Sequence, residues 1–147
     1  MKGSFTSLPE RMVKLTRDTA ETGADGKPVE TSISLVVRPY PAGFPQWLVS
    51  VYPAPVSYVN GEPVPDKVGA PTYAIRLNVL LLAKCLGDQL DTVAPAGVAT
   101  REAWDSYAVA ILGELGAANL VQGDIDALSD AMILVNRGAG RLGKVNS

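Results

Sequence analysis

The segment that most constrains the fold is Thr72–Val93, which carries the longest and most apolar helical pattern in the chain. Its apolar side chains recur three and four residues apart, the spacing of one face of an α-helix. Thr72 has the side chain of a helix N-cap, and Gly87 predicts a break or a close approach by another helix. Burying this face stabilises the chain more than any other segment would, so we predict that it forms the core. The residues of the face are Ile75, Val79, Leu82, Leu86 and Leu90.

The N-terminal part of the chain alternates with period two and predicts a β-hairpin. Residues 12–17 alternate roughly, and residues 29–37 alternate cleanly between apolar and polar side chains, which is typical of strands. Between them, Asp25-Gly26 marks a turn because glycine tolerates positive φ. A two-stranded hairpin is marginal by itself, so it is expected to lie on something or to add to a neighbour's sheet. The first ten residues are expected to form a loose or partner-bound arm.

Prolines shape residues 41–71. Apolar residues between Phe44 and Tyr52 fit one face of a short helix, with Pro45 in its first turn, although several of them also suit a strand. Asn60-Gly61 is a tight-turn signal in the middle of the proline-rich stretch that follows. This stretch forms either a loop between helices or a projecting arm that grips a neighbouring subunit.

Two further helical patterns follow the central segment. The first runs over Thr100–Leu115, and Asp124 is positioned to cap the second, which ends at Gly138. Short linkers between the three favour antiparallel neighbours. The sequence therefore predicts an α+β fold, in which an N-terminal β-hairpin and a proline-rich arm precede an antiparallel bundle of three to four helices.

The length of 147 residues favours a single domain with a sizeable core. We expect it to comprise an N-terminal arm and hairpin (1–40), a short helix and proline-rich loop (41–71), a helical bundle (72–138) and a basic tail (139–147).

Net charge and hydropathy limit the partners of the chain. A net charge of −2 gives no basis for general nucleic-acid attraction. The first residues lack the apolar stretch of a secretory signal, and no apolar run approaches the roughly 18–20 residues that span a bilayer. We therefore expect a soluble chain synthesised in the cytoplasm, with neither nucleic acid nor membrane as a partner.

Histidine is absent and Cys85 is the one cysteine. The missing histidine removes the usual general base at neutral pH and most zinc sites. Cys85 lies within an apolar pattern, so we predict a buried structural thiol and not a nucleophile. The expectation is a protein that is not an enzyme and that uses no cofactor, no metal and no small-molecule substrate.

Three short patterns resemble functional sites. Gly138–Lys144 matches G-x-x-x-x-G-K, but no Ser or Thr follows the lysine and no helix can form after it. The aspartates within residues 124–130 lack the spacing of a calcium loop and suit the first turn of a helix. Asp88 and Asp91 are three residues apart, which leaves a small carboxylate-dependent hydrolase as an alternative function.

Two groups of residues are candidates for contacts with partner proteins. Aromatic side chains gather around the proline-rich stretch, where they either cover the central helix or form a patch for another protein. Acidic residues dominate between Asp88 and Asp130 and basic residues follow, so the tail either stays solvated or meets the acidic helices of another copy. The candidate contact residues are Trp47, Tyr52, Tyr58, Asn60, Gly61, Tyr73, Arg137, Arg141 and Lys144.

The order of these parts resembles that of small proteins of tailed bacteriophages. The resemblance is carried by a ribbon ending in Leu35–Pro39, a short helix around Trp47-Leu48, a helix containing Leu81–Asp88 and a closing helix over Asp124–Asn136. Tail assembly chaperones of long-tailed phages are similar in this layout, although the proline-rich insertion departs from it.

The resemblance implies a non-enzymatic structural or assembly component of a phage capsid or tail. Its partners would be other virion or assembly proteins, including copies of itself. It would be found in the host cytoplasm during synthesis and in the virion if it is structural. The alternative within this class is a tail assembly chaperone or adaptor that is absent from the mature particle.

Overall fold

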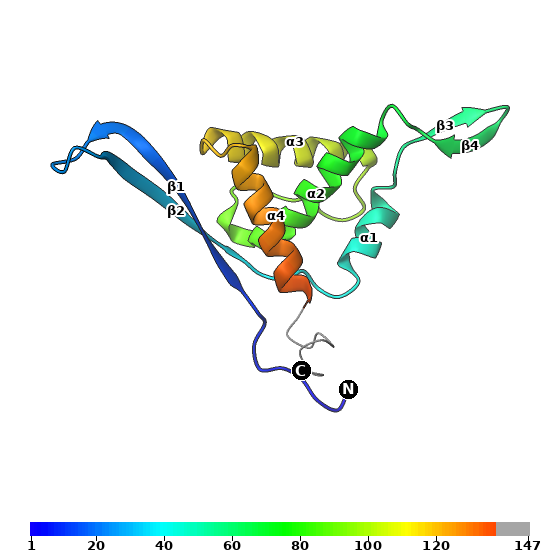
Figure 1. The fold of residues 1–147 in the computed structure, drawn as a ribbon. Coiled ribbons are helices and arrows are strands. Elements are labelled where there is room, and N and C mark those ends of the chain that lie inside the picture. The colour runs from blue at the N-terminus through cyan, green and yellow to red at the C-terminus, as the bar shows by residue number, and fades with distance from the viewer. Residues whose placement is uncertain (138–147) are drawn as a thin grey trace, which may run out of the picture. The chain divides into compact units, whose positions relative to one another are not determined.

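A computed structural model describes residues 1–137 and shows a mixed α and β fold (Figure 1). Within these residues an antiparallel hairpin comes first and four α-helices follow, with a second, smaller hairpin between the first two helices. The prediction of a mixed fold with an N-terminal hairpin is confirmed. Residues 1–137 contain no helix that is both long and apolar enough to cross a membrane.

Contacts group the chain into two compact units. The first, here called the ribbon unit, joins Met1–Pro39 to the chain from Gln122 onward, and the second, the helical unit, is Tyr40–Val121. The last helix therefore belongs with the N-terminal hairpin. The antiparallel bundle that the sequence indicates for all the later helices stays a prediction.

Strands β1 (Arg11–Thr22) and β2 (Pro28–Val37) form the long ribbon of the ribbon unit. Their pairing is regular up to Asp18, which lies opposite Glu30, and a register shift follows in β1 before the turn. Gly26 has a φ of 78° in that turn, a conformation that its lack of a Cβ makes inexpensive. The alternating pattern and the turn signal thus gave the right element.

Helix α4 (Gln122–Arg137) packs on the ribbon and contacts both strands. The face that includes Leu15 and Arg17 is the more buried one, as the alternation of burial along β1 shows. Arg17 forms a two-pronged ion pair with Asp124 of α4, with Nη1 donating to Oδ1 at 3.1 Å. These hydrogen bonds raise the pKa of the Arg17 guanidinium.

The prediction that Asp124 caps the last helix was wrong. α4 begins at Gln122, so Asp124 lies inside its first turn, where it is only 8% exposed. A buried carboxylate requires a partner of opposite charge, and Arg17 of the distant strand supplies it. The helix dipole favours an acidic residue at this position as well.

Helices α1 (Phe44–Val51), α2 (Ala70–Leu86) and α3 (Arg101–Ala117) build the helical unit, and a 3₁₀ turn, η1 (Gly87–Gln89), follows α2. Helix α2 contacts α3 directly. The core cluster of the helical unit consists of Leu48, Tyr52, Leu80, Trp104 and Ala108.

The ends of these helices follow the predicted signals in part. Thr100 caps α3, because its hydroxyl accepts a hydrogen bond from the Ala103 N–H at 3.1 Å. Gly87 ends α2 with a φ of 57°, as the predicted break requires. Thr72 does not cap α2, which begins at Ala70; the prediction overlooked that Pro71 fits the first turn, where its missing N–H costs nothing.

The apolar face of α2 differs from the prediction near its start. Tyr73 and Leu77 pack toward the core cluster there, whereas Ile75 is 59% exposed. The buried face follows Tyr73 because α1 and α3 lie on that side, and Ile75 points away from it. Cys85 is buried in the same helix, as predicted.

The proline-rich stretch contains a small hairpin of β3 (Val56–Val59) and β4 (Glu62–Pro65). Asn60 and Gly61 form its turn with φ values of 52° and 80°, which confirms the tight-turn signal. Nearly all of its residues are exposed, and Figure 1 shows it projecting from the helices of its own unit. Its use as a gripping arm stays a prediction.

Replacing Leu128 by alanine tests the packing of α4. Leu128 has no exposed surface, so Leu128→Ala is expected to lower the free energy of unfolding by about 2–5 kcal/mol through lost burial and a residual cavity. Ile133→Ala on the same helix is the control, because Ile133 is half exposed and its change should stay within about 0.5 kcal/mol. Urea denaturation measures both, and equal losses would contradict this packing.

Candidate functional site

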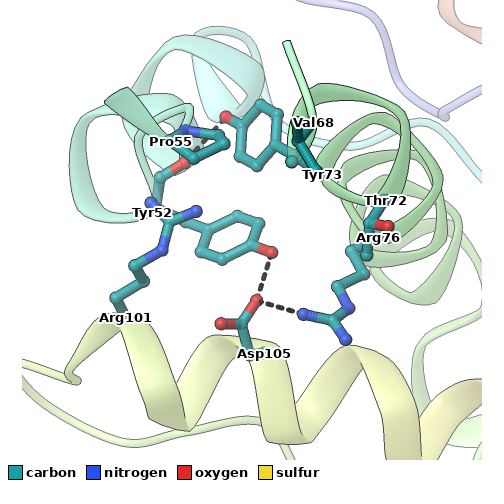
Figure 2. A pocket seen from close by; sticks show the side chains of 9 residues that line it. Tyr52, Pro55, Val68, Thr72, Tyr73, Arg76, Arg101 and Asp105 are labelled. Atoms are coloured by element: carbon teal, nitrogen blue, oxygen red, sulfur yellow. Dashed lines mark hydrogen bonds and ion pairs between the residues drawn. The ribbon is translucent and has the colours of Figure 1, made fainter. Parts of the chain in front are cut away.

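An open cavity of about 350 Å³ lies in the helical unit, beside the end of α1, the start of α2 and the first turns of α3 (Figure 2). Aromatic rings, arginines and one carboxylate line most of it. The lining residues are Tyr52, Pro55, Val68, Gly69, Thr72, Tyr73, Arg76, Arg101 and Asp105.

Asp105 of α3 is the centre of the polar contacts around this cavity. The Tyr52 hydroxyl donates to its Oδ1 at 2.5 Å, and Arg76 Nη1 of α2 donates to the same oxygen at 3.0 Å (Figure 2). Burial, followed by the hydrogen bond to Asp105, raises the pKa of Tyr52 to about 12. The phenol is therefore a neutral hydrogen-bond donor at physiological pH.

Arg101 of α3 contacts the two tyrosine rings of this cavity. Its guanidinium carbon lies 5.2 Å from the Tyr52 ring centroid and 5.9 Å from that of Tyr73, both within cation–π range. It also donates to the Pro53 carbonyl oxygen. The Tyr73 hydroxyl donates to the Tyr52 carbonyl at 2.8 Å, which ties α2 to the residue that ends α1.

These polar groups are directed mainly at one another. The carboxylate of Asp105 accepts from a phenol and a guanidinium, and Arg101 is held by a carbonyl and two rings. Together with the hydrogen bond between Tyr73 and the Tyr52 carbonyl, these contacts connect α1 with α2, α1 with α3 and α2 with α3. We therefore interpret the cluster as a structural junction that holds the three helices together, with the cavity as the space above it.

Sequence reasoning missed this junction. Arg76 and Asp105 were not among the candidate residues, yet each is about 30% exposed and the two are paired with each other. The two residues are 29 positions apart, and Tyr52 is 53 positions from Asp105. Periodicity within one helix carries no information about such a contact between elements.

Glu114 of α3 holds the segment after η1. Its carboxylate accepts from the backbone N–H groups of Asp91 and Thr92 at 2.7 and 2.8 Å, and from the Thr92 hydroxyl at 2.6 Å. These hydrogen bonds, led by that of the Thr92 side chain, lower the pKa of Glu114. The Glu114 carboxylate thus accepts three hydrogen bonds from the segment that contains Asp91, which suits an anchor for that segment.

In residues 1–137 no three Asp, Glu, Cys or His side chains gather into a set that could hold an ion. Gly138–Lys144, with its resemblance to a phosphate-binding loop, lies outside the described residues.

The predicted contact residues fall into different surroundings. Trp47 is 47% exposed and meets Trp104 edge to face, with ring centroids 5.9 Å apart. Tyr58 is 71% exposed on β3, next to the exposed turn of Asn60 and Gly61. Arg137 is exposed at the end of α4.

The remaining predicted contacts are buried, half-buried or outside the described residues. Tyr52 has no exposed area and Tyr73 is half-buried, because both belong to the junction around Asp105. We therefore leave these two out of the contact surface proposed below. Arg141 and Lys144 lie outside the described residues.

Replacing Tyr52 by phenylalanine tests the junction. Tyr52→Phe keeps the ring and removes the hydroxyl, so Asp105 loses one of its two donors. A hydrogen bond to a charged group contributes about 1.5–3 kcal/mol, and we expect a loss of that order in the free energy of unfolding. Tyr58→Phe is the matched control, since Tyr58 is exposed, and no change is expected. Identical behaviour of the two variants in urea denaturation would refute the role of the hydroxyl.

Replacing Glu114 by glutamine tests the anchor through its pH dependence. The pKa of Glu114 in the folded chain lies below the ordinary 4.5, so its stabilising effect is present above pH 4.5 and is lost as the pH falls through the folded value. Glu114→Gln should therefore be less stable than the wild type at pH 7, and the difference should shrink below pH 4.5. Thermal unfolding from pH 7 to pH 3 measures it, with Glu62→Gln on exposed β4 as the control. A difference that is constant with pH would contradict the anchor.

Comparisons of the chain with models of protein families, with curated proteins and with solved structures find no match. A proposal about function therefore rests on the geometry above and on the order of the parts. Two elements expose much of their surface to solvent: the half of the β1–β2 ribbon nearest its turn, and the β3–β4 hairpin.

Proposed function

We propose that the chain is a non-enzymatic structural or assembly component of a tailed bacteriophage particle, and that it acts through protein–protein contacts. Its partners are other virion or assembly proteins, including copies of itself. The observation that carries the proposal is the β1–β2 ribbon, whose half nearest the turn is exposed to solvent.

The ribbon has more pairing capacity than its own unit uses. Within residues 1–137, β1 and β2 have only each other as strand neighbours, so each presents an outer row of backbone N–H and C=O groups. All residues of β2 from Pro28 to Ser34 are exposed, Val29 and Ile33 among them. A two-stranded ribbon is marginal in water, and a partner that adds a strand to it would stabilise it.

The β3–β4 hairpin offers a different kind of contact. Pro63 and Pro65 in β4 have no N–H, so this strand makes a poor edge for strand addition. Its partner strand instead exposes the side chains of Val56, Tyr58 and Val59. An exposed aromatic ring beside β-branched residues suits side-chain packing against another protein.

The bacteriophage setting rests on the order of the parts: ribbon, short helix, central helix and closing helix. In this proposal the helices, as the predicted bundle, supply a rigid body, and the two hairpins make the contacts. The protein would be present in the host cytoplasm during synthesis and then in the virion.

Light scattering on the purified chain, alone and with the products of neighbouring genes, tests the proposal. We expect either an oligomer or a defined complex with one of those products. Proteomics of purified particles should then find the chain in stoichiometric copies. A monomer that binds none of the neighbouring products would overturn the proposal.

A tail assembly chaperone or adaptor would use the same exposed ribbon to hold another protein before assembly. In solution, a chaperone and a structural component would both bind a neighbouring gene product, so light scattering would not distinguish them. Its absence from purified particles would distinguish it from a structural component.

A further inference from the structure

Charge is distributed unequally between the two edges of the β1–β2 ribbon. β2 carries a single charged residue, Glu30. β1 carries both signs, with cations toward its start and anions toward its end. The charged residues of β1 are Arg11, Lys14, Arg17, Asp18 and Glu21.

Asp18 and Glu30 lie directly opposite each other in the ribbon. Both are exposed, and no ion pair within residues 1–137 is recorded for either of them. Like charges on directly opposed residues destabilise a strand pair. A cation brought to this position from outside the ribbon would relieve the repulsion.

A second copy of β1 can bring that cation. Two identical strands can pair antiparallel about a two-fold axis, with directly opposed residues on the same face of the joined sheet. In any such register the numbers of two opposed residues have the same sum at every pair, and this sum is even. If that sum is 32, Lys14 of one copy meets Asp18 of the other, and the reverse pair forms as well. Thr16 then meets its own counterpart on the axis.

Neighbouring registers lack this complementarity. With a sum of 34, Arg17 lies opposite Arg17 of the second copy. With sums of 36 and 28, the same happens to Asp18 and to Lys14. A sum of 30 pairs no charged residue with another. Only the register of 32 among these brings opposite charges together without a like-charged pair.

We propose that two copies of the chain join through the outer edges of their β1 strands, antiparallel and centred on Thr16, so that Lys14 of each copy pairs with Asp18 of the other. The inference rests on the proposed function and names the partner as a second copy. The two ribbons become one four-stranded sheet in the order β2, β1, β1, β2. Lys14 and Asp18 lie in the regular part of β1, before its register shift.

The arrangement is compatible with the contacts inside each copy. Lys14, Thr16 and Asp18 are exposed and share the face that also carries Glu30. Leu15 and Arg17 lie on the other face, where Arg17 keeps its ion pair with Asp124 of α4. In the register of 32, Arg17 faces Leu15 of the second copy, and the Arg17 of that copy is a diagonal neighbour that is paired with its own Asp124.

Symmetric pairing through β1 also closes, whereas pairing of β1 with β2 of another copy does not. If β1 of one copy paired with β2 of the next, each added copy would leave an edge open and a fibre would grow. A symmetric pair through β2 would bring only Glu30 and uncharged residues together, with no electrostatic gain.

Cysteine cross-linking tests the register in the full chain. Directly opposed residues of antiparallel strands have Cα atoms about 4.5–5.5 Å apart, which a disulfide can bridge. Thr16→Cys should therefore give a covalent dimer on mild oxidation. Ser32→Cys is the matched control: Ser32 lies opposite Thr16 on β2, so its two copies would be about 14 Å apart across three strand spacings and should not cross-link. Both are made with Cys85→Ala.

Charge reversal tests the ion pairs. Lys14→Asp places two acidic residues opposite each other at both Lys14–Asp18 positions of the dimer. We expect the dissociation constant of the dimer, measured by analytical ultracentrifugation, to rise at least about tenfold. The double variant Lys14→Asp with Asp18→Lys restores opposite charges in the same register and should recover the dimer. Circular dichroism checks that each variant is folded.

The outcomes separate this inference from the proposed function. A dimer that cross-links through Ser32→Cys and not Thr16→Cys, or one that is insensitive to Lys14→Asp, would overturn the β1 pairing. A wild-type chain that stays monomeric at all concentrations would overturn it too, and would show that the charges of β1 merely guard an open edge. The proposed function survives either result if a neighbouring gene product binds, and fails if none does.

Discussion

The ion pair between Arg17 and Asp124 joins a strand and a helix that are 107 residues apart, and the ribbon unit depends on that closure. A two-stranded ribbon has no second layer of its own, so its apolar face requires another element. Helix α4 supplies it, with the ion pair at the start of the helix and buried apolar residues such as Leu128 further along. The half of β2 nearest the turn has no such cover, so it stays exposed to solvent.

The helical unit buries its apolar side chains between three helices. Trp104 and Leu80 give it an apolar centre, and Asp105 adds a polar contact that only one arrangement of α1, α2 and α3 can satisfy. Because a partly buried carboxylate is costly without its donors, the junction fixes the helices relative to one another more specifically than apolar packing does. A rigid body of this kind can carry a small hairpin, β3–β4, in a defined direction from α1 and α2.

Sequence reasoning predicted the elements whose signals are local. The alternation that gave β1 and β2, the Asn60-Gly61 turn and the break at Gly87 each depend on residues close in the chain, and all three are present. Contacts between distant residues were not accessible in this way. Asp124 was expected to cap a helix and Asp105 was not singled out, because their ion-pair partners lie 107 and 29 positions away. The exposed hairpins were anticipated as contact elements, but the polar junction was not.

The two hairpins differ in the chemistry of their edges, and the contacts proposed for them differ accordingly. Pro63 and Pro65 remove two donors from β4, which makes its edge a poor one for strand addition, and β3 exposes side chains such as Tyr58. β1 has no proline and carries charges of both signs, so it can pair with a strand of matching charge. Self-pairing through β1 would use the backbone edge for copies of the chain. It would leave the side-chain surface of β3–β4 for a different protein, as a component that both oligomerises and binds a neighbour requires.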